Sequence, residues 1–253
     1  MNKYLLISII SILLYSCASK KNLLYFQGEP IKNVKAQNFN IKIKKDDFLG
    51  IHVFGADENS LQLFNFPPLT STTLNRGYSV GNPVSQGYLV DSKGEINFPV
   101  IGKLKVEGLN RSELIDLLQE KIKDYIKNPI ILVQIQNFKI TIIGEVRNPG
   151  TYTIPNERFT ILEAIGLAND LLITGKRNNI LVIRDEKGEK KEYLVDLRNK
   201  EIYNSPVYYL QQNDVIYVQP NQARINSSAA QFSYGIILSV TSLIITTVNI
   251  LTK

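Results

Sequence analysis

The sequence is poor in the residues on which many enzymes and metal proteins depend. Its 253 residues include one cysteine, Cys17, one histidine, His52, and no tryptophan. A single cysteine excludes an internal disulfide framework and a cysteine-based zinc site. Any histidine-dependent catalytic arrangement would have to use His52, which lies in a predicted strand between two apolar neighbours. We interpret His52 as an ordinary surface or hydrogen-bonded histidine.

Other catalytic signatures are missing as well. The chain has no G-x-S-x-G motif, and Gly175-Lys176 is followed by Arg177 without the upstream glycine of a phosphate-binding loop. Asp46 and Asp47 are paired carboxylates of the kind that glycosidases use, but adjacent residues in a turn usually cap or hydrate it. The sequence therefore predicts no enzyme, no catalytic residue, no metal and no cofactor.

The charge pattern limits the partners. The formal net charge is +6, with 21% charged and 44% apolar residues, as in an ordinary folded protein. No dense basic patch or basic helix is present, so we expect no nucleic-acid partner. The excess of positive charge favours anionic lipid or acidic polymers.

The region before Cys17 has the form of a secretory signal. Lys3 precedes the apolar run "YLLISIISILLYS", which is short for a membrane span. The residues before the cysteine, Leu14-Tyr15-Ser16, resemble a bacterial lipobox. Such signals are cut before the cysteine, which is lipidated, and several acyl chains give stable anchoring. We predict a signal peptide over 1–16 and lipidation of Cys17, with a plain buried or membrane cysteine as the alternative.

Residues 17–40 are polar and irregular and predict a lipidated tether. Within them, "NLLYFQG" (22–28) is close to the recognition sequence of a common laboratory protease, so a remnant of an expression tag is one reading. It differs from that sequence at two positions and no purification tag precedes it, which favours natural sequence.

Residues 41–137 predict a β-rich unit with one helix. Alternating apolar residues indicate strands on both sides of Asp46-Asp47, and 55–86 predicts an extended surface loop. "NRSELIDLLQEKIKDYI" carries a helical apolar stripe, a capping box formed by Asn110 and Glu113, and a stop at Asn128-Pro129.

Residues 138–222 predict a second small unit. Two strands flank Asn148-Pro149-Gly150, and a short helix begins with a capping box at Thr160 and Glu163. A hairpin around 186–189 and a last strand complete it. "KKDDFLGIHV" and "LQQNDVIYV" both place an aspartate in a polar turn before an apolar strand, which is weak evidence for related units.

The C-terminal segment predicts a membrane-spanning helix over 223–253. An uncharged run of about 20 residues is long enough for the ~30 Å core of a bilayer. On a helical wheel, small and polar residues form one stripe: Ser228, Gln231, Gly235, Ser239, Ser242, Thr246, Asn249 and Lys253. The stripe fits either water in a ring of helices or close helix packing. Gln231, Asn249 and Lys253 are more polar than packing requires, so we favour a water-facing, pore-lining stripe.

Two longer stretches resemble known domains. "GYLVDSKGEINFPVIGKLKVEGLNRSELIDLLQEKIKDYIKNPIILVQI" resembles the polysaccharide biosynthesis/export domain, with its D-G-x-I-x-x-P-x-x-G type of hairpin and a Gly-Leu entry to the helix. "KITIIGEVRNPGTYTI" with "TILEAIGLAND" resembles the SLBB module, whose hallmark is G-E-V-x-x-P-G-x-Y. The chain departs from that pattern at Ala168-Asn169-Asp170, where the module usually has Ala-Gly-Gly.

The resemblance implies an outer-membrane polysaccharide export lipoprotein that is not an enzyme. The implied fold is α+β, with two small β-rich, β-grasp-like periplasmic domains and a C-terminal transmembrane helix. The implied assembly is a homo-oligomeric ring, expected to be an octamer, that conducts polysaccharide passively and docks on an inner-membrane polysaccharide co-polymerase or tyrosine kinase. A lipid-anchored module that binds a glycan or partner without conducting is the alternative, and an envelope glycosidase is a third.

Overall fold

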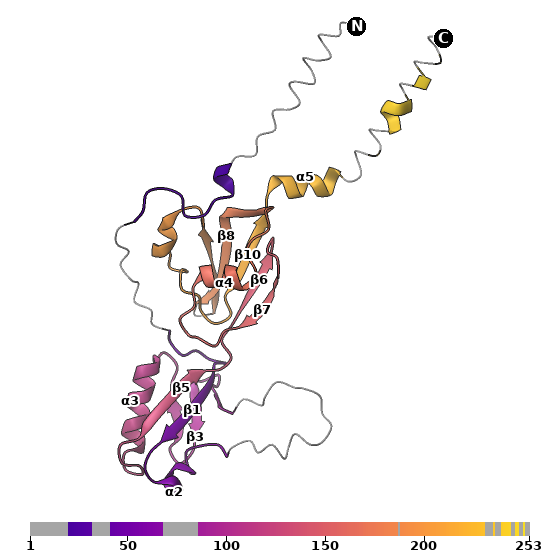
Figure 1. The fold of residues 1–253 in the computed structure, drawn as a ribbon. Helices are drawn as coiled ribbons and strands as arrows, with labels where there is room; N and C mark the ends of the chain where they lie inside the picture. Colours follow the sequence, from indigo (N-terminus) through magenta and orange to yellow (C-terminus); the bar gives the residue numbers. More distant parts are fainter. Residues whose placement is uncertain are drawn as a thin grey trace.

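The computed structural model describes residues 20–31, 41–67, 86–186 and 188–230, together with residues 235, 239–243, 246–247 and 250. These residues form two mixed α+β units that follow one another along the chain (Figure 1). The α+β class expected from the sequence is thereby confirmed for the folded body.

The first unit is built on a three-stranded antiparallel sheet in the order β2-β1-β5. Its strands are β1 (Phe48–Phe54), β2 (Tyr88–Leu89) and β5 (Ile130–Ile135), and a separate hairpin joins β3 (Glu95–Phe98) to β4 (Gly102–Lys105). The alternating apolar residues of β1 pack inward against the apolar stripe of α3 (Arg111–Ile122). Together with the hairpin they form one hydrophobic core.

The capping box predicted for α3 is confirmed. The Asn110 side chain accepts from the Glu113 amide at 3.0 Å, and the Glu113 carboxylate accepts from the Asn110 amide at 2.8 Å. The helix ends at Ile122, before the predicted stop at Asn128-Pro129, and Asn128 has φ of 53° in the turn that leads to β5. The loop predicted over 55–86 contains a short helix, α2 (Glu58–Leu61), capped by Asp57. Four residues show no helical period, so the prediction missed it; residues 68–85 lie outside the described part.

The second unit is a five-stranded sheet in the order β7-β6-β10-β8-β9. The strands are β6 (Lys139–Gly144), β7 (Gly150–Thr153), β8 (Gly175–Glu186), β9 (Glu189–Val195) and β10 (Val215–Pro220), with β10 parallel to β6. The short helix α4 (Ile161–Leu167) buries Ile161, Ala164 and Ile165 in the core of this unit. Its predicted capping box, Thr160 with Glu163, is also confirmed.

Gly144 explains one position of the G-E-V motif. It has φ of 94°, and a Cβ placed on it would lie 2.1 Å from the carbonyl oxygen of Val218 on β10. Only glycine allows that approach of two backbones without displacing the strand.

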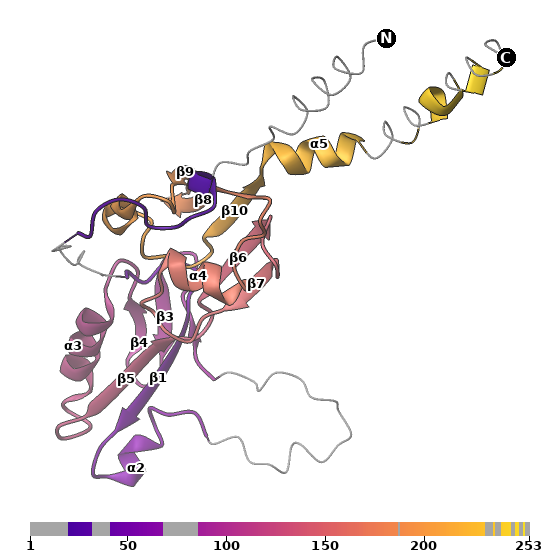
Figure 2. The same ribbon diagram turned by 45° about the horizontal axis from the view of Figure 1, so that its top comes forward.

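Two segments leave the same end of the second unit: the 3₁₀ turn η1 (Lys20–Asn22) and the helix α5 (Gln222–Ala230) (Figure 2). The sequence predicted a membrane-spanning helix over 223–253, and this prediction is wrong for the described residues, where no helix combines the length and apolarity that a bilayer requires. The nine residues of α5, "QARINSSAA", are largely polar, so the helix that continues from β10 starts as a polar segment.

Candidate functional site

The predicted site residues fall at the two ends of the chain. Cys17, Gln231, Asn249 and Lys253 lie outside the described residues. Ser228 is on α5, and the remaining members of the predicted stripe are helical: Gly235, Ser239, Ser242 and Thr246.

The hydroxyl groups of this stripe bond to their own helix. Ser228 donates to the Ile225 carbonyl at 2.8 Å, and Thr246 donates to the Ser242 carbonyl at 2.8 Å. Such bonds satisfy the hydroxyl without water. The neighbouring Val240 and Leu243 are 50% and 71% exposed, so both faces of the segment are open in one copy. Either arrangement considered for this segment, a ring of copies or a packed pair of helices, would cover one of its two faces.

The described part of the predicted tether, residues 20–31, makes contacts with the second unit. The backbone amides of Phe26 and Gln27 donate to the carbonyls of Leu197 and Arg198 at 3.1 and 2.7 Å. Lys200 donates to the carbonyls of Gly28 and Glu29 at 2.5 and 2.7 Å. The segment "LLYFQG" therefore docks on the second unit, and we call residues 20–29 the docked segment.

Two aromatic side chains hold the docked segment. Phe26 stacks on Tyr203 with ring centroids 6.2 Å apart and planes 8° apart. Tyr25 lies beneath the Arg177 guanidinium, 5.2 Å from its ring centre, and its hydroxyl donates to the Asp170 carboxylate at 2.5 Å. Burial and the bond to Asp170 raise the pKa of Tyr25 to about 12. Nothing in the polar composition of residues 17–40 predicts this docking, but the paired aromatics were its available signal.

The departure from Ala-Gly-Gly lies at this contact. Asn169 and Asp170 have φ of 57° and 71°, the left-handed region that glycine enters most readily. Asparagine and aspartate tolerate this region better than other residues because their short side chains bond locally. Asp170 does so, since its carboxylate accepts from the Leu171 amide at 2.7 Å. The turn therefore keeps a glycine-like backbone and gains a carboxylate that binds Tyr25.

The two aspartate turns noted in the sequence share one geometry. The preceding residue, Asp46 or Asn213, has φ of 65° in both turns. In each, the aspartate accepts from the amide three residues earlier: Lys44 to Asp47 and Gln211 to Asp214, both at 2.7 Å. The similarity between the two sequence stretches thus corresponds to a repeated turn, which leads into β1 in the first unit and β10 in the second.

The two buried aspartates differ in their partners. Asp214 is fully buried and accepts two bonds from Arg184, at 2.9 and 2.7 Å. Asp47 is 2% exposed, and its Oδ1 atom has no hydrogen-bond partner in the structure. Burial raises the pKa of Asp47 to about 6, against the opposing effect of the Lys44 amide. Asp46 is exposed, whereas Asp47 caps the turn by accepting from the Lys44 amide.

The repeated turns meet where the two units join. The Asn137 side chain accepts from the Phe48 amide at 2.9 Å and donates to the Asp46 carbonyl at 2.8 Å, while its own carbonyl accepts from Gln212 at 2.7 Å. Lys44 reaches across to Gln211 at 2.9 Å. A cleft of about 990 Å³ lies beside these contacts, lined mainly by charged and amide side chains.

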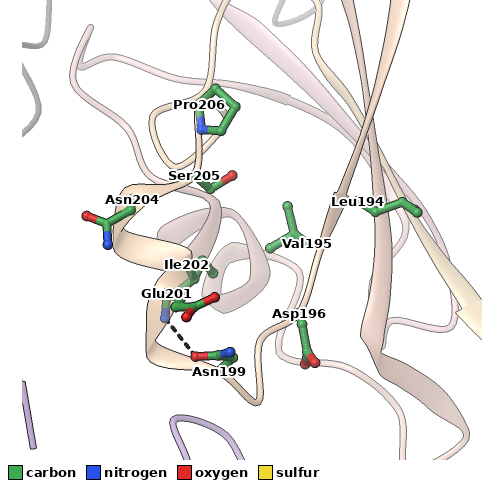
Figure 3. Close-up of a pocket in the computed structure, with 9 residues that line it drawn as sticks. All are labelled: Leu194, Val195, Asp196, Asn199, Glu201, Ile202, Asn204, Ser205 and Pro206. Atoms are coloured by element: carbon green, nitrogen blue, oxygen red, sulfur yellow. Dashed lines mark hydrogen bonds between the residues drawn. The ribbon is translucent and has the colours of Figure 1, made fainter.

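A smaller pocket of about 490 Å³ lies against β9 and the 3₁₀ turn η3 (Lys200–Asn204) (Figure 3). Asn199 caps η3 by accepting from the Glu201 amide at 2.9 Å. The carboxylates and amides here are typical surface groups and form no metal cluster; none is found anywhere among the described residues.

Comparison with known proteins matches both units. The family model for polysaccharide biosynthesis/export protein matches residues 35–136, and that for the SLBB domain matches residues 138–218. The chain is 30% identical over 128 residues to "EPS I polysaccharide export outer membrane protein EpsA" of Ralstonia solanacearum, covering 47% of this chain and 34% of that protein. It is 39% identical over 67 residues to "Polysialic acid transport protein KpsD" of Escherichia coli, covering 25% and 12%.

The matched stretch thus spans about a third of the length of EpsA, and the names of these relatives describe export or transport. The two matches follow one another in the order of the two folded units. The chain carries a polysaccharide biosynthesis/export domain followed by an SLBB domain, which confirms the resemblance found in the sequence.

Proposed function

We propose that this protein is a lipid-anchored, non-catalytic component of an outer-membrane machine that exports polysaccharide. The observation that carries the proposal is the succession of an export domain and an SLBB domain along one chain, as in a family whose relatives are named for polysaccharide export. The lipobox-like sequence before Cys17 supports anchoring at the membrane.

In this proposal several copies form a closed ring, and an octamer is our expectation. The ring surrounds a hydrated path along which the polymer slides without a deep binding site. The stripe on the C-terminal segment, which includes Ser239 and Thr246, faces this path, and an inner-membrane co-polymerase or tyrosine kinase supplies energy and gating. Hydroxyl and amide groups interact with sugar hydroxyls in passing, much as water does.

The proposal is tested by deleting the gene in a polysaccharide-producing host and complementing it. Loss of surface polymer with accumulation inside the envelope, restored by the full chain, is the expected result. Normal polymer on the surface of the deletion strain would contradict a role in export. Loss of polymer synthesis itself, without accumulation, would point to a different step.

Conduction is distinguished from binding by cysteine labelling. Ser239→Cys and Thr246→Cys are expected to react with water-soluble thiol reagents in intact cells, while Val240→Cys and Ile244→Cys, on the other side of the helical wheel, are not. Equal reaction of both pairs, with monomers in native mass spectrometry of the extracted full chain, would favour the anchored binding module instead.

A further inference from the structure

One end of the second unit gathers exposed apolar side chains and positive charge. It consists of η1 with Leu24, the loop 168–176, residues 144–148 and α5, and we call it the terminal face. Hydrogen bonds hold its parts together: the Asn221 amide donates to the Thr174 carbonyl at 2.7 Å, and the Arg147 amide donates to the Asp170 carbonyl at 3.1 Å. Arg224 on α5 pairs with Glu145 at 3.3 Å.

The apolar side chains of this face are unusually open. Ile173, in the loop before β8, is 71% exposed, and Leu172 beside it is 36% exposed. Leu24 of the docked segment and Ile225 of α5 are 47% and 45% exposed. Scattered exposed apolar residues are normal, but four on one end of a small domain mark a surface that contacts something else.

The charge of the terminal face is positive. It carries five basic residues outside the core, namely Lys20, Lys21, Arg147, Lys176 and Arg224. Its acidic residues are Glu145 and Asp170, and both are engaged, Glu145 by Arg224 and Thr174 and Asp170 by Tyr25. Basic side chains around an exposed apolar tip are what an anionic membrane surface attracts.

The docked segment restricts how far this face can lie from the proposed anchor. Lys20 is held against the second unit by the contacts of Tyr25, Phe26 and Gln27. Only two residues separate Lys20 from Cys17, so even a fully extended chain spans no more than about 10 Å between them. If the acyl chains of Cys17 lie in a bilayer, the terminal face lies within about that distance of its headgroups.

We propose that the terminal face rests on the headgroup layer of an anionic lipid bilayer, with Ile173 at the contact. The inference builds on the proposed lipid anchor at Cys17 and adds a second contact beside it. The SLBB domain is then seated on the membrane directly, by apolar insertion and by charge, and the docked segment fixes its distance from the anchor.

The test uses the full-length protein, in which the proposed acylation of Cys17, the single native cysteine, leaves the introduced cysteine as the free thiol for labelling. Ile173→Cys is labelled with an environment-sensitive fluorophore and reconstituted in vesicles of phosphatidylethanolamine and phosphatidylglycerol that contain lipid with a spin label near the headgroup. The matched control is Ile130→Cys on β5 of the first unit, since Ile130 is 68% exposed. Quenching by the spin-labelled lipid depends on nearness to the membrane and not on contact between copies.

We expect at least threefold stronger quenching at position 173 than at position 130, and a loss of this difference in Lys20→Glu/Lys21→Glu. Equal quenching at both positions would overturn the inference. Mass spectrometry of the N-terminal peptide in the wild-type protein tests the anchor separately. An acylated Cys17 with no quenching at 173 rejects the membrane contact alone, whereas an unmodified Cys17 rejects the proposed anchor, whatever position 173 shows.

Discussion

The Tyr25 hydroxyl donates to the Asp170 carboxylate at 2.5 Å, joining two residues that lie 145 positions apart in the sequence. Asp170 occupies a left-handed turn position with φ of 71°. The contact therefore links the segment that follows the proposed lipid anchor to the turn in which this chain departs from its family's usual sequence. The departure and the docking are one structural feature.

Removing the Tyr25 hydroxyl is expected to loosen the docked segment. In Tyr25→Phe the ring still lies under Arg177, but the bond to Asp170 is lost, at a cost of about 1 kcal/mol for this exposed contact. That corresponds to a roughly fivefold rise in hydrogen exchange at the Phe26 and Gln27 amides. Hydrogen-exchange mass spectrometry measures it, with Tyr125→Phe on the first unit as control. Unchanged exchange would show that the aromatic contacts suffice.

Asn169 and Asp170 offer a matched pair of glycine substitutions. Asn169→Gly removes a left-handed non-glycine residue while leaving the Tyr25 contact, so we expect the free energy of unfolding to rise by about 0.5 kcal/mol with the segment still docked. Asp170→Gly relieves similar strain but loses the bonds to Tyr25 and to the Leu171 amide. We expect faster exchange at Phe26 and little net change in stability, read from exchange and chemical denaturation on the same samples. Release of the segment in both variants would contradict the role assigned to the carboxylate.

The sequence predicted the folded body well because its signals are local. The capping boxes at Asn110 and Thr160 depend on residues three positions apart in the sequence. The docking of Tyr25 depends on Asp170 and Arg177, which no local pattern connects to it. A polar, irregular stretch looks the same whether it is free or bound to a distant surface.

The membrane-spanning helix failed for a related reason. Hydropathy over the last residues measures composition, whereas a span also needs one continuous helix of sufficient length. Among the described residues, α5 is a largely polar helix and no helix is long and apolar enough to cross a bilayer, while much of the uncharged run lies outside the described part. The repeated aspartate turn was noticed in the sequence, but its unequal partners, Arg184 for Asp214 and none for Asp47 Oδ1, became visible only in three dimensions.

The raised pKa of Asp47 predicts that the stability of the fold depends on pH. Its pKa is raised to about 6 in the folded protein from an ordinary 3.8, so the folded state binds the proton more tightly than the unfolded state. This group therefore destabilises the fold fully above pH 6, by about 3 kcal/mol, and the penalty disappears as the pH falls toward 4.

Asp47→Asn should remove this dependence, since the amide oxygen still accepts from Lys44 and the side chain carries no charge. We expect the variant to be more stable than the wild type at pH 7 and to lose that advantage by pH 4, measured by urea unfolding across this range. Asp46→Asn, on the exposed neighbour, is the control. A wild type and Asp47→Asn with parallel curves would show that Asp47 is solvated in the folded protein.

Variants of the Arg184–Asp214 pair test whether the turn at Asp214 depends on the guanidinium group of Arg184. Arg184 donates twice to Asp214 and also to the carbonyls of Pro206 and Tyr209, at 3.2 and 2.9 Å. Arg184→Ala leaves a fully buried carboxylate uncompensated, which costs about 3–5 kcal/mol. Arg184→Lys restores the charge but not the planar fork, so it should recover only part of the loss. Lys190→Ala, which breaks the exposed pair with Asp185 at 2.9 Å, should cost less than about 1 kcal/mol.

Arg184 also bears on the relation between the two turns. If Asp47→Asn stabilises the first unit while Asp214→Asn destabilises the second, the same turn serves opposite energetic roles because only one of its aspartates has a cationic partner. Denaturation of the four variants, Asp47→Asn, Asp214→Asn, Arg184→Ala and the double variant Arg184→Met/Asp214→Leu, measures this. The double variant is expected to recover most of the loss, since it leaves no unpaired buried charge. A double variant as unstable as Arg184→Ala would instead show that the bonds from Arg184 to Pro206 and Tyr209 hold the turn.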